Sequence, residues 1–230
     1  MNEIIRWAEE RPLFRFKEAE REFDYGKEYL KVKLHRLAKK NELKRIEKGK
    51  YTVHEDPMIY ASHIETPSFL SLWTALRYYN LTTQQPTKVH IITSKEKKDL
   101  DNIKFHSTKK SFGYSKKIYK GFQIFVADKE RLLLDCLKYR TVPTDELDEL
   151  IKEVEPGKTI EYTLNLENKA LNKRVGYLLE EKTDISKRIG EKLEELQQSI
   201  DRNYTVLDLS KPNKGEKNSR WRIKVNTDAA

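Results

Sequence analysis

The sequence predicts an α+β protein, in which a winged helix-turn-helix over residues 1–55 precedes a mixed helix-and-sheet domain over residues 56–230. Three observations lead to this expectation. Short segments with helical periodicity precede a basic β-hairpin at the N-terminus. Strand-like and helix-like segments follow one another in the remainder of the chain. The 230 residues are also enough for a small module and a second domain with its own core.

The first 55 residues contain three predicted helices. Apolar periodicity indicates helices over residues 2–10 and 16–23, with Pro12 between them. A third helix is predicted over residues 27–40, because its apolar residues recur at intervals of three and four. These residues are Leu30, Leu34, Leu37 and Ala38.

A β-hairpin is predicted directly after the third helix. Asn41 can end that helix, because asparagine tolerates the left-handed conformation. Strands are predicted at residues 43–46 and 51–53, joined by a turn that contains Lys48 and Gly49. Three helices followed by a basic hairpin describe a winged helix-turn-helix, whose third helix enters the major groove of DNA while the hairpin flanks the backbone.

Positive charge is concentrated in this part of the sequence. The chain has a formal net charge of +9, which favours nucleic acid as a partner first and an anionic membrane second. Between Tyr25 and His54, ten Lys and Arg residues stand against three Glu residues. The charge therefore lies where a DNA-binding helix and hairpin need it.

Eleven residues are candidate DNA contacts. Cations of the third helix can donate to guanine edges or phosphates, and Val32 could meet a thymine methyl group. Cations of the hairpin can bind phosphates without sequence preference. The alternatives are a solvated helix face and cations that protect an edge hairpin from aggregation. The candidates are Lys27, Glu28, Lys31, Val32, His35, Arg36 and Lys39 in the helix, and Lys44, Arg45, Lys48 and Lys50 in the hairpin.

The second domain is predicted to begin with a helix over residues 67–80, with Thr66 as its N-cap and Pro67 at its first position. Three strands, four helices and two closing strands are predicted to follow. Strands are expected at residues 88–93, 103–105, 121–127, 204–209 and 221–225, and helices at residues 127–139, 144–153, 168–181 and 185–200.

Catalytic residues, metal ligands and cofactors are not expected. The glycines form no phosphate-binding loop, the five histidines lack metal-ligand spacing, and the single cysteine, Cys136, reads as a small buried hydrophobe. No apolar run is long enough to cross a bilayer, and the N-terminus lacks a basic region before an apolar core. A cytoplasmic protein that is not an enzyme is therefore expected.

Four stretches of the second domain carry a resemblance to a known family. They are PSFLSLWTALRYYNL at residues 67–81, ADKERLLLD at 127–135, KRVGYLLE at 173–180 and RWRIKVN at 220–226. In this order, and behind a basic N-terminal module, they resemble the AbiEi antitoxins of AbiE-type (abortive infection, type IV) toxin–antitoxin systems. Asn80 stands where that family has glycine, but asparagine also accepts the left-handed position at a helix end.

The resemblance implies a transcriptional repressor that binds double-stranded DNA at its own promoter and counteracts a nucleotidyltransferase-like toxin. One alternative is an interaction protein that neutralises its partner by direct contact, with DNA binding secondary. A second is a stand-alone winged-helix regulator without a toxin, and a third is an enzyme that modifies the toxin or a nucleotide.

Two further segments have more than one interpretation. Residues 88–120 contain ten lysines with interleaved aromatics, which suits a second nucleic-acid surface, a toxin or RNA docking surface, or a solvated strand edge with inward-facing aromatics. An apolar stripe over residues 185–200 could form a dimer seam, but its length favours packing on the domain's own core.

Overall fold

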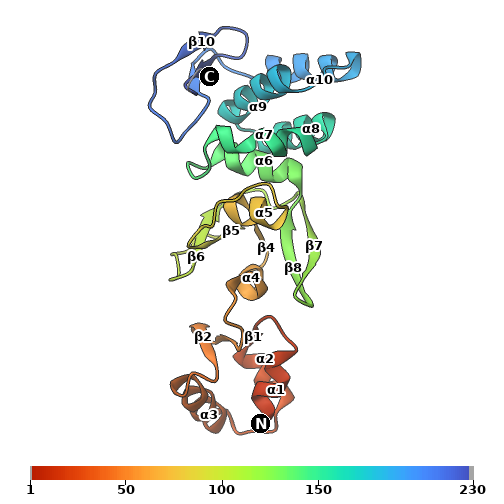
Figure 1. The fold of residues 1–230 in the computed structure, drawn as a ribbon. Helices are drawn as coiled ribbons and strands as arrows, with labels where there is room; N and C mark the ends of the chain where they lie inside the picture. Colours follow the sequence, from red (N-terminus) through yellow and green to blue (C-terminus); the bar gives the residue numbers. More distant parts are fainter. Residues whose placement is uncertain (1, 228–230) are drawn as a thin grey trace.

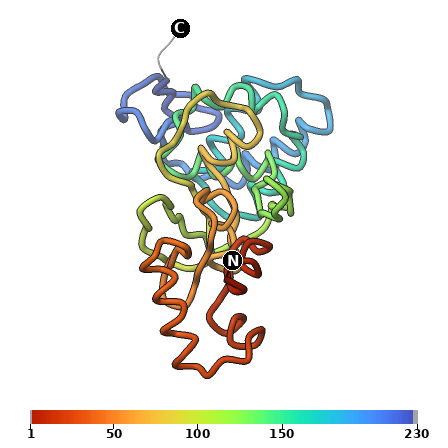
Figure 2. Tube along the Cα trace, turned by 60° about the horizontal axis from the view of Figure 1, so that its bottom comes forward, coloured from red at the N-terminus to blue at the C-terminus, as the bar shows by residue number. Residues whose placement is uncertain are grey.

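The computed structural model describes residues 2–227 and has the shape of an elongated body (Figure 1). The N-terminal helices occupy one end, a five-stranded sheet lies in the middle, and the helices of residues 129–198 lie at the other end. In the turned view, the N-terminal segment (red to orange) and the helical segment (green to blue) again lie at opposite ends of the molecule (Figure 2). Helices and strands are both abundant, which confirms the α+β class.

The N-terminal region contains α1 (Glu3–Glu9), α2 (Phe16–Glu22) and α3 (Lys27–Lys39), followed by a hairpin of β2 (Lys44–Glu47) and β3 (Lys50–Thr52). The short strand β1 (Phe14–Arg15) pairs with β3, so that β3 lies between β1 and β2. Asn41 ends the third helix with a φ of 58°. The predicted order of helices and strands is therefore present.

A separate hydrophobic cluster holds these N-terminal elements together. Its buried members come from all three helices, from β1 and from the start of the hairpin. They are Ile4, Ala8, Phe14, Ala19, Leu30, Leu34, Leu37 and Leu43. Leu13 instead belongs to the larger cluster formed by the rest of the chain, and Ile46 packs against that larger cluster. The N-terminal elements thus have their own core and also contact the body.

The central sheet consists of β4 (Ser68–Leu70), β5 (Val89–Thr93), β6 (Ile103–Ser107), β7 (Tyr114–Tyr119) and β8 (Phe122–Ala127). Its strand order is β6-β5-β4-β8-β7. The pairs β5–β6 and β4–β8 are parallel, whereas β4–β5 and β7–β8 are antiparallel. The short elements α4 (Pro57–Tyr60) and η1 (Ala61–His63) connect the hairpin to this sheet.

The prediction of one helix over residues 67–80 is wrong in its first part. Residues Ser68–Leu70 form the central strand β4, and the helix α5 covers only Leu72–Tyr78. Phe69 and Leu70 are both fully buried, because a central strand is covered on its two faces. Such a short apolar run does not distinguish a buried strand from a buried helix. Asn80 ends this stretch with a φ of 58°, as the sequence suggested.

The helical end of the molecule contains α6 (Lys129–Lys138), η2 (Thr144–Leu147), α7 (Asp148–Glu153), α8 (Pro156–Leu166), α9 (Lys169–Lys182) and α10 (Lys187–Gln198). The helix α8 and the strand β7 were not among the predicted elements. The apolar stripe of α10 packs on the domain's own core, since Leu193 and Leu196 are buried in the larger cluster. Cys136 is buried in α6, as expected.

A small three-stranded sheet closes the chain. It has the order β10 (Glu216–Asn218), β11 (Ile223–Val225) and β9 (Thr205–Val206), and β10 lies between the two strands predicted at residues 204–209 and 221–225. Trp221 is fully buried against α9, and a Cβ atom at Gly176 would lie 2.1 Å from its ring. The glycine therefore makes room for the tryptophan, which joins two of the four family-like stretches.

Candidate nucleic-acid interface

The helix α3 has one buried and one exposed face. Leu30, Leu34 and Leu37 pack into the N-terminal cluster. All seven candidate residues of this helix are exposed, and Val32 has 46% of its surface exposed. The apolar spacing of the sequence determines this orientation, because residues three and four apart share one helix face.

A groove of about 680 Å³ lies between α3 and the β2–β3 hairpin. Seven of its lining residues are Lys or Arg, and none is Asp or Glu. These cations are Arg15, Lys17, Lys27, Lys31, Arg45, Lys48 and Lys50. His35 also lines the groove. The arrangement produces a concave surface with positive potential, which attracts polyanions.

The start of α2 contributes to this groove because it is tied to the hairpin turn. The backbone N–H of Phe16 donates to the carbonyl of Gly49 at 2.8 Å. The rings of Phe14 and Tyr51 are stacked, with their centroids 5.5 Å apart. These contacts place Arg15 and Lys17 beside the turn. Sequence reasoning missed both residues, and their only signal was a pair of basic residues at the start of a helix.

The structure brings together only some of the predicted contact residues. Lys27, Lys31 and His35 share the groove with Arg45 and Lys48. In contrast, Arg36 and Lys39 line a second, smaller hollow of about 440 Å³ with Lys33 and Lys40. The exposed face of α3 thus carries cations on both of its flanks.

One candidate of α3 is acidic and is already paired. The Lys31 ammonium donates to the Glu28 carboxylate at 2.7 Å, and this hydrogen bond lowers the pKa of Glu28. The carboxylate is therefore ionised at neutral pH and offsets part of the charge of Lys31. Such an exposed pair is weak and can exchange partners with a phosphate.

Two predicted phosphate contacts of the hairpin have other partners. Lys44 forms an ion pair with Glu55. The Lys50 ammonium lies 2.6 Å from Glu47 and 3.0 Å from Glu65, and only 17% of the Lys50 side chain is exposed. Lys50 lines the groove with its stem, but its charge points towards the second domain. Its geometry does not support the predicted role of a free phosphate-binding cation.

The part of the chain after the hairpin has a buried ionic network of structural character. Arg131 donates to Asp135 at 2.9 Å and to the carbonyls of Lys110 and Phe112 at 3.0 Å each. The hydroxyl of Ser71 donates to the same aspartate at 2.8 Å. Complete burial raises the pKa of Asp135 despite the adjacent arginine. The network links the sheet to α6 and is closed to solvent.

Three other features bear on function: possible metal ligands, a pair of histidines and possible membrane-spanning helices. Within residues 2–227, no group of three His, Cys, Asp or Glu side chains is placed to hold a metal ion. His90 and His106 lie in contact, with ring nitrogens 3.1 Å apart, and burial lowers the pKa of each to about 4. Across the same described part of the chain, no helix has the length and apolar character of a membrane span.

Comparison with known proteins agrees with this architecture. A crystal structure of the RV2827C protein from Mycobacterium tuberculosis superposes with a TM-score of 0.62 at 10% sequence identity, covering 92% of this chain and 85% of that chain. At this identity the likeness shows a shared fold. No curated protein gives a significant sequence match.

A family profile described as "Transcriptional regulator, AbiEi antitoxin" matches residues 2–54, which span α1 to the end of the hairpin. The matched residues include the whole of α3 and the cationic groove beside it. The N-terminal region of this chain is therefore similar to the AbiEi antitoxin family of transcriptional regulators.

Proposed function

We propose that the protein is a transcriptional repressor that binds double-stranded DNA at its own promoter and acts as the antitoxin of a type IV system. In this proposal residues 1–55 form a winged helix that reads DNA. Residues 56–230 form a second domain that counteracts a nucleotidyltransferase-like toxin in the cytoplasm.

The observation that carries the DNA-binding proposal is the groove between α3 and the hairpin. Its lining contains seven Lys or Arg residues and no carboxylate, beside a helix whose outer face is exposed. A helix of this diameter fits the major groove of B-DNA. With α3 in the major groove, the hairpin cations Arg45 and Lys48 are placed to meet the flanking phosphates.

The residues of α3 divide into two proposed roles. Lys27 and Lys31 lie on the groove side and would bind phosphates, with Glu28 released from Lys31 or accepting from cytosine. Base edges would be read by the four remaining exposed candidates. These are Val32, His35, Arg36 and Lys39.

The antitoxin role is supported by the description of the matched family. Direct contact with a toxin is one way in which residues 56–230 could act, and repression of a toxin gene is another. Co-purification of the two proteins from a strain that expresses both would favour direct contact. Loss of toxin protection on removal of DNA binding alone would favour repression.

The test of DNA binding is a salt-titrated affinity measurement on the protein's own upstream DNA and on a scrambled duplex. The Lys31→Ala/Lys48→Ala variant should weaken binding to both duplexes alike. If each lysine neutralises one phosphate, the slope of log K against log salt should fall by about 1.8. Arg36→Ala should instead reduce the preference for the upstream DNA, by about 1–3 kcal/mol if Arg36 makes a bidentate base contact.

The matched control is Lys187→Ala/Lys214→Ala, which removes the same charge from exposed positions in the part of the chain after the central sheet. This control should keep the wild-type slope. An equal slope change in both double variants would show that net charge, and not the groove, determines binding. Absence of wild-type binding to either duplex at low salt would refute the DNA-binding proposal.

A further inference from the structure

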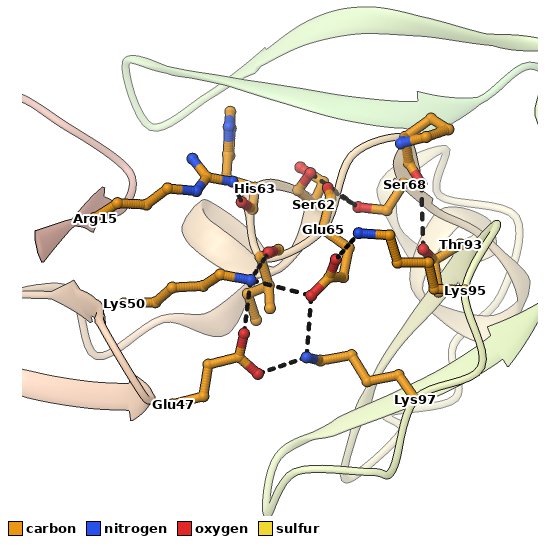
Figure 3. Close-up of polar contacts among 12 residues, drawn as sticks. Arg15, Glu47, Lys50, Ser62, His63, Glu65, Ser68, Thr93, Lys95 and Lys97 are labelled. Carbon is orange, nitrogen blue, oxygen red and sulfur yellow. Dashed lines mark hydrogen bonds and ion pairs between the residues drawn. The ribbon is translucent and has the colours of Figure 1, made fainter. Parts of the chain in front are cut away.

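The hairpin is connected to the second domain by a closed ring of four ionic side chains (Figure 3). Glu47 and Lys50 come from β2 and β3, whereas Glu65 precedes β4 and Lys97 lies in the loop between β5 and β6. The ammonium of Lys50 lies 2.6 Å from Glu47 and 3.0 Å from Glu65. The ammonium of Lys97 forms ion pairs with the same two carboxylates, at 3.1 Å to Glu65.

The ring is more enclosed than an ordinary surface pair. The exposed fractions of its side chains are 17% for both lysines, 23% for Glu47 and 12% for Glu65. Positive and negative charges alternate around the ring, so that each charge has two partners of opposite sign. Because water is largely excluded, these interactions are less screened than those of exposed pairs.

Further contacts surround the ring. Lys50 also donates to the carbonyl of Ile64, and Lys95 adds a third cation to Glu65 at 3.2 Å. Arg15, which lines the groove, donates to the carbonyl of His63 at 3.4 Å. The segment before β4 therefore receives side chains from both β1 and β3, and Figure 3 shows Arg15 and Lys50 extending towards it.

The position of the ring in the hairpin gives it a consequence for the groove. Glu47 and Lys50 flank the turn, and the two residues between them are Lys48 and Gly49. Lys48 and Gly49 form the wall of the groove that faces α3. Holding both ends of a tight turn fixes the direction in which its tip projects.

We propose that Glu65 and Lys97 are positioning residues for DNA recognition: by holding Glu47 and Lys50, they fix the hairpin turn opposite α3. This inference rests on the proposed function and extends it, because it gives the second domain control over the shape of the DNA-binding groove. A displacement of the segment before β4 or of the β5–β6 loop would move the turn and lower the affinity for DNA.

The decisive variant is Glu65→Gln, because two explanations predict opposite results. If Glu65 acts only through its charge near DNA, its neutralisation removes a repulsion and strengthens binding. If it holds the turn, neutralisation leaves two lysines with one carboxylate in the ring, and binding to the upstream DNA weakens by about tenfold. The matched control is Glu96→Gln, which removes the same charge from an exposed position of the β5–β6 loop, next to Lys97.

A distance measurement tests the same proposal without DNA. Cys136 is buried, so spin labels can be directed to Glu22→Cys on α2 and Glu195→Cys on α10, both of which are exposed. The labelled protein should give a narrow distance distribution. Adding Glu65→Gln or Lys97→Met should broaden this distribution, whereas adding Glu96→Gln should leave it unchanged.

The results distinguish failure of the proposed DNA-binding function from failure of the positioning role of Glu65 and Lys97. Absence of DNA binding by the wild type would refute the proposed function, and the distance distributions would still judge the ring. Equal affinities for Glu65→Gln and Glu96→Gln, together with unchanged distributions in folded variants, would overturn the positioning role. Broadened distributions with weakened upstream binding would establish it.

Discussion

The chain has two basic segments that differ in how their cations are used. Around α3 and the hairpin, seven Lys or Arg residues and no carboxylate line one groove, and only Lys50 among them directs its charge away from it into the ion pairs with Glu47 and Glu65. In residues 88–120, ten lysines are distributed over three strands and their loops, and half of them have partners within the protein. Similar charge density in a sequence can therefore correspond to different surfaces.

The paired lysines of residues 88–120 serve to connect elements. Lys95 and Lys97 hold Glu65, and Lys120 forms an ion pair with Asp56 at 2.7 Å. Lys110 pairs with Glu167 at 2.8 Å, and Lys88 donates to the carbonyl of Leu100 at 3.4 Å. These contacts join the sheet to the segments around it.

The aromatic residues of the same segment pack against other parts of the protein, which favours the inward-facing interpretation. Phe105 is buried, Tyr114 stacks on Phe69 with centroids 4.7 Å apart, and Phe112 meets Tyr162 edge to face at 5.1 Å. A surface that binds single strands would need such rings exposed for base stacking. The number of cations and aromatic residues in a segment therefore does not distinguish a binding surface from a segment that packs on the protein. The partners of those side chains do.

The largest expected effect tests the structural character of residues 88–120. Arg131→Met removes the cation that binds Asp135 and the carbonyls of Lys110 and Phe112. It should lower the free energy of unfolding by about 3–5 kcal/mol, because a buried carboxylate loses its ionic partner. Urea denaturation measures this change, with the exposed Lys109→Met as control. A loss below about 1 kcal/mol would contradict a structural role for the network.

A smaller effect is expected from pH. Burial alone would raise the pKa of Glu65, but hydrogen bonds from Lys50, Lys97 and Lys95 lower it from 4.5 to about 2. The carboxylate therefore stabilises the folded state above pH 4.5, and this contribution is lost as the pH falls from 4.5 towards 2.

Urea denaturation between pH 6 and pH 3 checks this dependence. Wild type should lose more stability than Glu65→Gln over that range, since only in wild type does the unfolded state take up a proton at residue 65 that the folded state resists. Other acids titrate in both proteins, so the difference between the two curves reports on Glu65. Parallel curves would show that the lysines of the ring do not hold this carboxylate.

The smallest effect is expected on DNA affinity from the remaining lysines of residues 88–120. Lys98→Ala/Lys109→Ala/Lys116→Ala removes three exposed cations outside the groove. Affinity should change by less than about threefold at physiological salt, because charges further than a Debye length from the DNA are screened. A loss as large as that of Lys31→Ala/Lys48→Ala would instead identify a second nucleic-acid surface.

Much of the N-terminal fold could be predicted from local pattern. The periodicity of Leu30, Leu34 and Leu37 defined α3 and its exposed face, and Asn41 marked its end. Prediction failed where local pattern is ambiguous. Residues Ser68–Leu70 are apolar enough for either a strand or a helix, and only pairing with β5 and β8 made them the centre of a sheet.

The candidate DNA-binding residues were also predicted only in part, because local pattern determines which face of a helix is exposed but not which distant side chains lie beside it. Exposure of the α3 candidates follows from helix geometry, and the structure agrees. Arg15 and Lys17 reach the groove through pairing of β1 with β3, which no local pattern shows. The geometry does not favour the predicted phosphate contact of Lys50, because its ammonium pairs with Glu65, which lies outside the hairpin in the sequence.

The sequence by itself determined the order of the N-terminal elements, the basic face of α3 and the resemblance to AbiEi antitoxins. These features depend on side-chain spacing and composition within short segments, which local geometry converts directly into faces and turns. Only the tertiary structure decided which cations remain free. An ion pair depends on a distance between residues such as Glu47 and Lys97, and that distance is set by the packing of the whole chain.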